Sequence, residues 1–306
     1  MLQEHLACAR RAAETPSTGF RRRRFAIRLC IRFFTALTLL AAVLAVPALW
    51  TGNAAPIRSA APEKPGIPVD VELVIAVDIS YSMDPDEQAL QREGYIKALT
   101  SREFLQALRQ GINGKIAITY FEWAGYTERR VVVPWRVIEG PESADAFVGE
   151  IAAAPYRRAA RTSISGAIEF GAALFENSGY RGLRRVIDIS GDGANNNGQL
   201  VTVSRDEALA KGITINGLPI MLKRGSYVNM DIDKLDVYYE DCVIGGPGAF
   251  VIAIEERDKF IEATRTKLVL EIAGRVPPAR IIPVAADKPR VPCTIGERLW
   301  QERWGN

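Results

Sequence analysis

Residues 71–82 read VELVIAVDISYS, and this stretch decides the fold of the chain. Its first seven residues are apolar apart from Glu72, so they predict a buried β-strand that ends at Asp78. A continuous apolar run of this length is typical of a strand in a parallel sheet with both faces covered. The polar residues Asp78, Ser80 and Ser82 therefore follow the carboxyl end of a strand, which is where such sheets bind ligands.

The rest of the central region repeats an alternation of short apolar runs and longer amphipathic ones. Period-2 and apolar runs predict further strands at 115–123, 128–135, 184–190, 213–220 and 249–254. Apolar residues at helical spacing predict helices at 84–110, 143–153, 163–177, 204–211 and 256–273. Such alternation favours an α/β fold with a mostly parallel sheet and helices on both faces. We expect this domain to span residues 70–274.

The N-terminal region predicts export from the cytoplasm. Within residues 1–53, the arginine cluster at 21–24 precedes an apolar stretch at 33–50, which is the pattern of a signal peptide or an N-terminal membrane anchor. The sequence leaves cleavage open. Because the arginines hold the N-terminus inside, we expect the domain in the periplasm or another extracytoplasmic space, and attached to the inner membrane if the segment is not cleaved.

Two proline-rich segments flank the predicted domain. Residues 54–69 are rich in proline and alanine without periodicity and are expected to form a linker. Residues 275–306 contain five prolines between positions 277 and 292 and are expected to form a C-terminal tail without a core element. The end of this tail, RLWQERW at 298–304, can pack on the domain or contact another protein, and the sequence does not distinguish these two possibilities.

Charge and cysteine usage narrow the class of protein. The formal net charge is +3, but residues 1–50 hold eight arginines and two glutamates, so the remaining residues carry 31 basic and 34 acidic side chains. Without a basic stripe, nucleic-acid binding is not expected. Cys242 and Cys293 are the two cysteines outside the leader, and in an oxidising compartment they either form one disulfide or stay as two buried thiols.

Two more motifs carry hard oxygen ligands and lie far from the first. Thr162 precedes a predicted helix in RTSISGAI, and Asp192 follows a predicted strand in ISGDG. Carboxylates and hydroxyls suit Mg²⁺, Mn²⁺ or Ca²⁺ rather than zinc or copper. In an extended turn, residues two apart point the same way, so Asp78, Ser80 and Ser82 can converge on one ion. The sequence predicts one metal site of five residues, with Mg²⁺ as the expected cation.

These residues resemble those of von Willebrand factor A domains with a metal-ion-dependent adhesion site (MIDAS). Asp78, Ser80, Ser82, Thr162 and Asp192 match the five positions of that motif one by one. The resemblance covers about residues 70–274 and implies a three-layer Rossmann-like fold. It also implies a divalent cation that accepts an Asp or Glu from a protein partner. The segments ISGDGANNNG and AAPYRRAARTSISGAI are similar to an uncharacterised bacterial group of exported single-domain proteins of this type.

Plainer explanations exist for each motif alone. Asp78-x-Ser-x-Ser is also compatible with a turn in which Ser82 or Asp84 caps the next helix, and Thr162 or Ser163 is a suitable N-cap. The run GDGANNNG has the composition of a flexible turn. The joint occurrence of all three motifs at predicted strand ends favours the metal site.

The histidine content argues against several enzyme classes. His5 is the only histidine and lies in the leader, so a Ser-His-Asp hydrolase and a His-ligated zinc enzyme are excluded. The remaining enzymatic alternative is a metal-dependent phosphoesterase with Asp78 as nucleophile. That chemistry usually requires a second acid two residues later, where this chain has Ser80. We therefore predict a binding domain and not an enzyme.

Overall fold

The computed structural model describes residues 66–222, 232–274 and 289–305. The predicted leader, residues 1–53, lies outside the described residues. Within the described residues, no helix is long and apolar enough to cross a membrane. Residues 63–306 form one compact unit, which contains every element described below.

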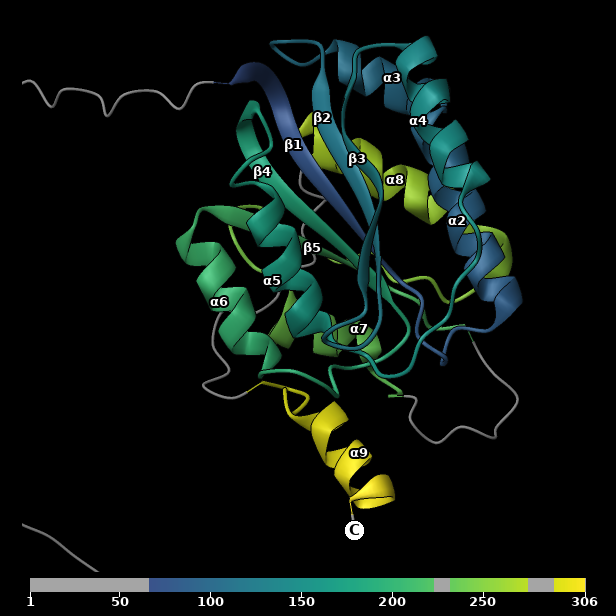
Figure 1. Ribbon diagram of the computed structural model, residues 1–306, viewed down its shortest axis with the longest axis vertical. Coiled ribbons are helices and arrows are strands. Elements are labelled where there is room, and N and C mark those ends of the chain that lie inside the picture. The colour runs from purple at the N-terminus through teal and green to yellow at the C-terminus, as the bar shows by residue number, and fades with distance from the viewer. Residues whose placement is uncertain (1–65, 223–231, 275–288, 306) are drawn as a thin grey trace, which may run out of the picture. The chain divides into compact units, whose positions relative to one another are not determined.

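A five-stranded sheet forms the centre of this unit, in the order β3-β2-β1-β4-β5 (Figure 1). The strands are β1 (Ile67–Asp78), β2 (Ile116–Trp123), β3 (Arg129–Ile138), β4 (Tyr180–Gly191) and β5 (Ile213–Pro219). Neighbouring strands are parallel except β2 and β3, which form an antiparallel pair. The mostly parallel α/β sheet predicted from the sequence is confirmed.

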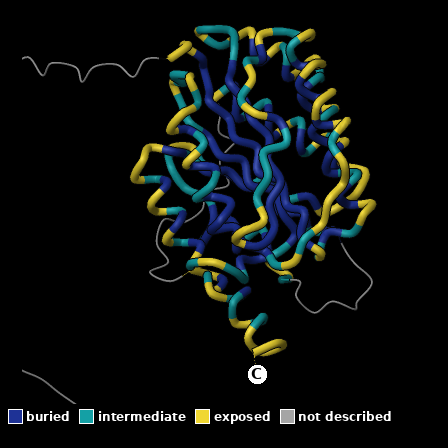
Figure 2. The backbone as a smooth tube through the Cα atoms, viewed as in Figure 1, coloured by how far each residue is buried: buried dark blue, intermediate teal, exposed yellow. Residues whose placement is uncertain are grey.

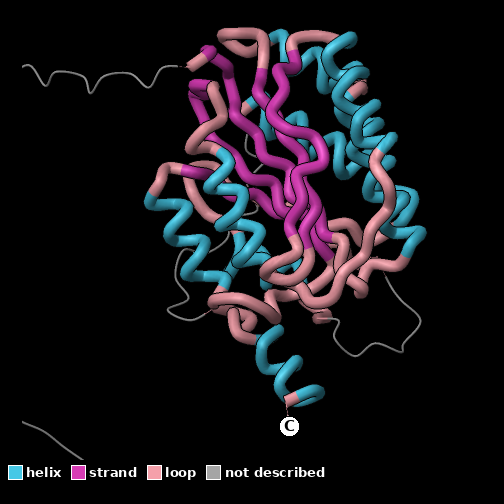
Figure 3. The backbone as a smooth tube through the Cα atoms, in the orientation of Figure 1, coloured by secondary structure: helices cyan, strands magenta, loops and turns pink. Residues whose placement is uncertain are grey.

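Helices cover both faces of the sheet (Figures 1 and 3). One face packs against α2 (Pro85–Leu99), α3 (Arg102–Arg109), α4 (Pro141–Ala153) and α8 (Phe260–Ala273). The other face packs against α5 (Ile164–Leu174), α6 (Val201–Ala210), α7 (Leu235–Tyr238) and the π-helix at Tyr239–Val243. A short 3₁₀ helix at Arg257–Lys259 precedes α8, and α9 (Ile295–Trp304) ends the described chain.

The alternation of side chains along β1 explains the two separate cores. Leu73, Ile75 and Val77 contribute to the core under α2 and α8, whereas Val74 and Ala76 contribute to the core under α5 and α6. Successive side chains of a strand point to opposite faces, so a strand that is apolar at every position fills both cores. The strands accordingly form the buried centre in Figure 2.

The structure differs from the sequence expectation at several element boundaries. The helix expected at 84–110 is two helices, because Ser101 caps α3 by accepting a hydrogen bond from Phe104 N at 3.2 Å. The strand expected at 249–254 forms only isolated bridges to the end of β5 and beyond it. β1 begins at Ile67, three residues before the expected start of the domain. The start of α2 is as predicted, with Asp84 as N-cap and Pro85 in the first turn.

The tail from residue 275 ends in a helix that was not predicted from the sequence, and Gly296 is its only buried residue. Residues 295–304 form α9, and Cys242 and Cys293 form a disulfide that ties the residues before α9 to the π-helix. Arg290 strengthens this attachment, because its guanidinium pairs with Asp241 at 2.7 Å and with Glu240 at 2.6 Å. The prolines lie before α9 rather than in it, so they do not prevent a helix at the end of the chain.

Candidate metal centre

The candidate site lies at the carboxyl ends of β1 and β4. The chain places β2 and β3 on one side of β1 and β4 and β5 on the other, so the direction of strand addition reverses between β1 and β4. Parallel sheets bind ligands at such a reversal, where the loops after the two strands separate. β1 and β4 are paired up to Val77 and Ser190, which brings the loop after Asp78 next to the loop after Gly191.

Hydrogen bonds join four of the five predicted ligands. Ser80 N donates to Asp78 Oδ1 at 2.7 Å, and the hydroxyls of Ser80 and Ser82 lie 2.7 Å apart. Ser82 Oγ then donates to Asp192 Oδ1 at 2.7 Å. Asp78, Ser80 and Asp192 are buried, whereas Ser82 is partly exposed. Residues from two loops more than a hundred positions apart thus form one connected polar cluster.

The loop before α5 brings Thr162 to the same place. Tyr81 N donates to Ala159 O at 2.9 Å, which joins this loop to the one after β1. The Thr162 hydroxyl lies beside the loop after β4, because a Cβ added to Gly193 would stand 3.8 Å from Thr162 Oγ1. The structure therefore brings all five predicted residues to one edge of the sheet.

Asp78 is the most unusual residue of the cluster. It is fully buried, and its Oδ2 has no hydrogen-bond partner among the described residues. Burial, and then the nearby Asp192 carboxylate, raise the pKa of Asp78 well above its usual range, against hydrogen bonds from Ser80 and from the Asp192 backbone. A buried carboxylate oxygen without a donor is costly, so the site is incomplete as an arrangement of protein groups alone.

The space beside this oxygen depends on Gly191. A Cβ at this position would stand 2.9 Å from Asp78 Oδ2 and 3.0 Å from the Tyr239 hydroxyl. The Tyr239 hydroxyl is also buried without a hydrogen-bond partner among the described residues. Burial, and then Asp78, raise the pKa of Tyr239, so this phenol stays protonated. Any side chain larger than that of glycine would close the space beside Asp78.

The donor set fits a hard divalent cation. Across the described residues, no three His, Cys, Asp or Glu side chains gather at one point where they could hold a metal ion. The cluster instead combines two carboxylates with the hydroxyls of Ser80, Ser82 and Thr162, an all-oxygen set that suits Mg²⁺, Mn²⁺ or Ca²⁺. A cation there would neutralise the repulsion that raises the pKa of Asp78. The role of these residues as ligands stays a prediction.

Three consecutive asparagines connect the loop after β4 to three other segments of the chain. From the sequence, their segment was expected to form only a turn. Each side-chain oxygen accepts one backbone N–H from another segment: Asn195 from Ser165 at 2.9 Å, Asn196 from Thr162 at 2.9 Å and Asn197 from Tyr126 at 2.8 Å. Asn196 N also donates to Thr162 O at 2.8 Å. The available signal was the repetition of a side chain that readily bonds to backbone groups.

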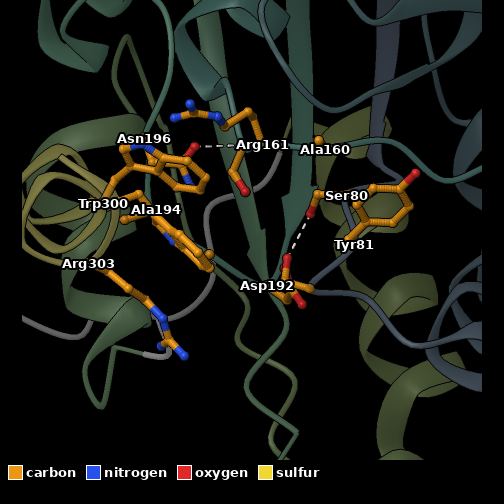
Figure 4. Close-up of a pocket in the computed structure, with 14 residues that line it drawn as sticks. Ser80, Tyr81, Ala160, Arg161, Asp192, Ala194, Asn196, Trp300 and Arg303 are labelled. Carbon is orange, nitrogen blue, oxygen red and sulfur yellow. Dashed lines mark hydrogen bonds between the residues drawn. The ribbon is translucent and has the colours of Figure 1, made fainter. Parts of the chain in front are cut away.

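A pocket of about 280 Å³ opens over the cluster (Figure 4). Ser80, Ser82, Thr162 and Asp192 line it, whereas Asp78 is not among the lining residues. The helix α9 supplies Gly296, Trp300, Arg303 and Trp304 to the same pocket. The candidate metal centre is therefore open to a ligand from outside, with the C-terminal helix as one wall.

Three solved structures are similar to the chain at low sequence identity. The pilus adhesin SpaC from Lactobacillus rhamnosus GG has a TM-score of 0.50 at 14% identity, over 69% of this chain and 31% of SpaC. Proximal thread matrix protein 1 from the mussel byssus, with a zinc-occupied MIDAS motif, has a TM-score of 0.48 at 15% identity, over 68% of this chain and 49% of its own chain. A von Willebrand factor type A protein from Catenulispora acidiphila has a TM-score of 0.45 at 13% identity, over 67% of this chain and 43% of its own chain. The chain spans less than half the length of each of these proteins.

Together with the sheet order, the likeness to SpaC shows a three-layer, Rossmann-like α/β fold for the described domain. No functionally curated protein matches the chain. Residues 68–276 match a family that is described as protein of unknown function, DUF1194. This match covers about two thirds of the 306 residues and includes all five residues of the polar cluster. The chain therefore belongs to the DUF1194 family.

Proposed function

We propose that this chain is a metal-dependent protein-binding domain of the adhesion or scaffolding type. Asp78, Ser80, Ser82, Thr162 and Asp192 hold a divalent cation, with Mg²⁺ expected and Mn²⁺ or Ca²⁺ as alternatives. The observation that carries the proposal is the buried Asp78 Oδ2, which has no described donor and belongs to a hydrogen-bonded cluster whose hydroxyls line an open pocket. With only two carboxylates around it, a bound cation keeps an electrophilic position that accepts an Asp or Glu of a protein partner.

The protein groups have separate tasks in this proposal. Asp78 and Asp192 supply the negative charge, and the three hydroxyls supply neutral oxygen atoms. Ser80 N holds the Asp78 carboxylate in place through its 2.7 Å hydrogen bond, and Asn196 holds the Thr162 backbone from both sides. Positions fixed in this way cost little reorganisation when a partner binds.

An extracytoplasmic location is part of the proposal. The Cys242–Cys293 disulfide lies in the described domain, and structural disulfides persist in oxidising compartments. Together with the basic and apolar pattern of residues 1–53, this favours an exported or membrane-anchored protein.

Calorimetric titration of the purified protein with Mg²⁺, Mn²⁺ and Ca²⁺ tests the metal site. Wild type should bind at least one of the three, and Asp78→Asn should weaken that binding by at least about 100-fold, since even residues outside the ligand set often contribute 10- to 100-fold. Asp70→Asn is the matched control. Asp70 lies near the other end of β1 and accepts hydrogen bonds from Asn113 N and Lys115 N. Equal binding by wild type and Asp78→Asn would contradict the proposal.

Turnover is the outcome that would favour the enzymatic alternative. The protein should not hydrolyse p-nitrophenyl phosphate in the presence of any of the three cations. Metal-dependent hydrolysis that Asp78→Asn abolishes and Asp70→Asn retains would instead identify Asp78 as the nucleophile of a phosphoesterase.

A further inference from the structure

The helix α9 is fixed against the loop that carries Asp192. A Cβ added to Gly296 would stand 2.1 Å from Asn195 O, so the first turn of α9 lies directly on this loop. Asn195 Nδ2 donates to Glu297 Oε1 at 2.8 Å, and the Cys242–Cys293 disulfide holds the chain just before the helix. The helix α9 is thus held in place by the domain where it forms one wall of the pocket.

This wall combines indole rings with guanidinium groups. The Arg161 guanidinium lies over the Trp300 ring, 3.3 Å from its centroid, and the Trp300 and Trp304 centroids are 5.9 Å apart. Figure 4 shows Trp300 and Arg303 on one side of the pocket and Ser80 and Tyr81 on the other, with Asp192 between them. The pocket therefore has a cationic and aromatic side opposite its hydroxyl-lined side.

Arg161 is held in a strained backbone conformation. Its φ is +74°, and in the described part of the chain it is the only residue other than glycine with a positive φ. This backbone conformation is unfavourable for a residue with a side chain, and such residues cluster at binding sites. The strain places the guanidinium against Trp300, beside the candidate ligands.

The two arginines of the pocket have unused hydrogen-bonding capacity. Neither Arg161 nor Arg303 forms an ion pair with a carboxylate of the described residues; their observed contacts are with Trp300 and Trp304. A guanidinium that stacks on a ring through its face keeps its N–H donors at the edge, in a geometry that suits a carboxylate. The wall thus offers a second place for an acidic group, separate from the cation.

The rim indicates a polypeptide rather than a small molecule. Tyr81 and Trp304 line the pocket and are each 61% exposed, so aromatic surface continues beyond it. A small dicarboxylate confined to about 280 Å³ would leave this surface uncovered. A peptide would cover it with its neighbouring side chains.

On the basis of the proposed function, we propose that α9 and Arg161 form a second subsite that selects a diacidic peptide segment of a partner protein. One acidic side chain reaches the cation, a second pairs with Arg161 and Arg303, and an apolar side chain near them packs on Trp300 and Trp304. The metal then supplies attachment, and the α9 wall supplies the choice of partner.

Selection from a random heptapeptide library displayed on phage tests this subsite. The selection is carried out separately on wild type, Arg161→Gln, Arg303→Gln and Arg298→Gln. In each case the peptides bind to the protein in the presence of Mg²⁺ and are eluted with EDTA. Wild type should enrich peptides with two acidic residues and an apolar one. The most enriched peptide, once synthesised, should bind about tenfold or more weakly to Arg161→Gln and Arg303→Gln, because hydrogen bonds to charged groups contribute on that scale.

The controls separate this inference from the proposed function. Arg298 lies exposed on α9 but does not line the pocket, so Arg298→Gln should bind the peptide like wild type. Arg303 is exposed, so Arg303→Gln reports on the subsite even if Arg161→Gln does not fold. Gly296→Ala should displace α9 and lose the peptide while retaining Mg²⁺ binding, whereas Gly149→Ala, where a Cβ meets nothing within 4 Å, should change neither.

Three results would contradict the inference. The selection could enrich peptides with a single acidic residue that bind all four proteins equally in the presence of the metal. This result would overturn the second subsite and leave the proposed function intact. Succinate that binds as tightly as the selected peptide would overturn the choice of a polypeptide. A selection in which EDTA elutes no enriched peptide would contradict the proposed function and this inference together.

Discussion

Two buried aspartates on neighbouring strands are compensated in opposite ways. Asp188 of β4 points to the face covered by α2 and α8, where the Lys267 ammonium pairs with it, and both side chains are fully buried. Asp78 of β1 points to the other face, and no lysine or arginine of the described residues pairs with it. One buried carboxylate has its cation within the chain, and the other does not.

The Asp188 environment is a polar network that contains its own cation. Lys267 Nζ also contacts Glu271 Oε1 at 2.5 Å, and Asn216 Nδ2 donates to the same oxygen at 3.0 Å. Tyr95 donates to Asp188 Oδ2 at 3.4 Å. A buried charge persists when it is paired, and Lys267 is that partner for both acids, although Glu271 Oε2 has no hydrogen-bond donor among the described residues.

The contrast separates a charge that the chain itself neutralises from one that it leaves without a counter-charge. Both aspartates have a raised pKa, and in both cases burial is the largest cause. For Asp188 the next influence is Lys267, which lowers the pKa, whereas for Asp78 it is Asp192, which raises it further. The fold thus supplies Lys267 as a counter-charge for Asp188, which lies in the packed interior. At the open edge of the sheet it leaves a charge that a cation from solution can neutralise.

The largest effect is expected from removing the internal cation. Lys267→Met should lower the free energy of unfolding by about 3–5 kcal/mol, because it leaves Asp188 and Glu271 buried without their partner. Urea unfolding followed by circular dichroism measures the change. Lys259→Met, at a side chain that is 60% exposed beside Glu262, should change it by less than about 0.5 kcal/mol. A loss below about 1 kcal/mol for Lys267→Met would show that the network is not the ionic one described.

At the candidate metal centre, removing a charge should not lower the free energy of unfolding, in contrast to the loss expected for Lys267→Met. In EDTA, Asp78→Asn should leave the free energy of unfolding unchanged or raise it by about 1 kcal/mol, because it removes a buried charge with no described counter-ion. With Mg²⁺ at 100 times its dissociation constant, wild type should gain about 2.7 kcal/mol that the variant does not gain. Asp188→Asn should be destabilised in both conditions. A loss of stability for Asp78→Asn in EDTA would remove the distinction between the two aspartates.

The strand ends of the site could be predicted because the information is local. A buried strand shows as an apolar run, and the polar residue that ends it marks the sheet edge, as at Asp78 and Asp192. Their proximity followed from parallel pairing, which brings the carboxyl ends of β1 and β4 together. The five predicted residues converge at one edge of the sheet as expected, and their role as metal ligands stays a prediction.

The surroundings of the site could not be predicted, because they depend on contacts between distant segments. The run Asn195–Asn197 has turn composition, and its bonds to three other segments appear only in the folded chain. Lys267 lies in a helix with charged residues throughout, so nothing local distinguishes it from the exposed ones. The position of α9 depends on the disulfide and on the close contact at Gly296, and the sequence left the disulfide open.

The smallest effect concerns the pH dependence of the Asp188 network. Burial, and then Asp188, raise the pKa of Glu271 to about 7 against the influence of Lys267. Arg184 and Tyr95 are the other ionisable groups that face the pair of acids. Because the pKa of Glu271 is higher in the folded state, its contribution to stability is complete below about pH 4.5 and is lost as the pH rises through about 7.

Glu271→Gln should therefore flatten the pH profile of stability. Urea unfolding in EDTA at pH 5, 6 and 7 should show wild type losing about 1–2 kcal/mol more than the variant between pH 5 and 7. Asp78 contributes a loss of the same sign to both proteins, so the difference reports on the pair of Glu271 and Asp188, whose pKa values depend on each other. Glu262→Gln, at an exposed position of α8, should follow wild type. Parallel profiles for wild type and Glu271→Gln would mean that Glu271 stays ionised beside Lys267. The network would then carry a net negative charge without external help, and the contrast with Asp78 would rest on the lysine alone.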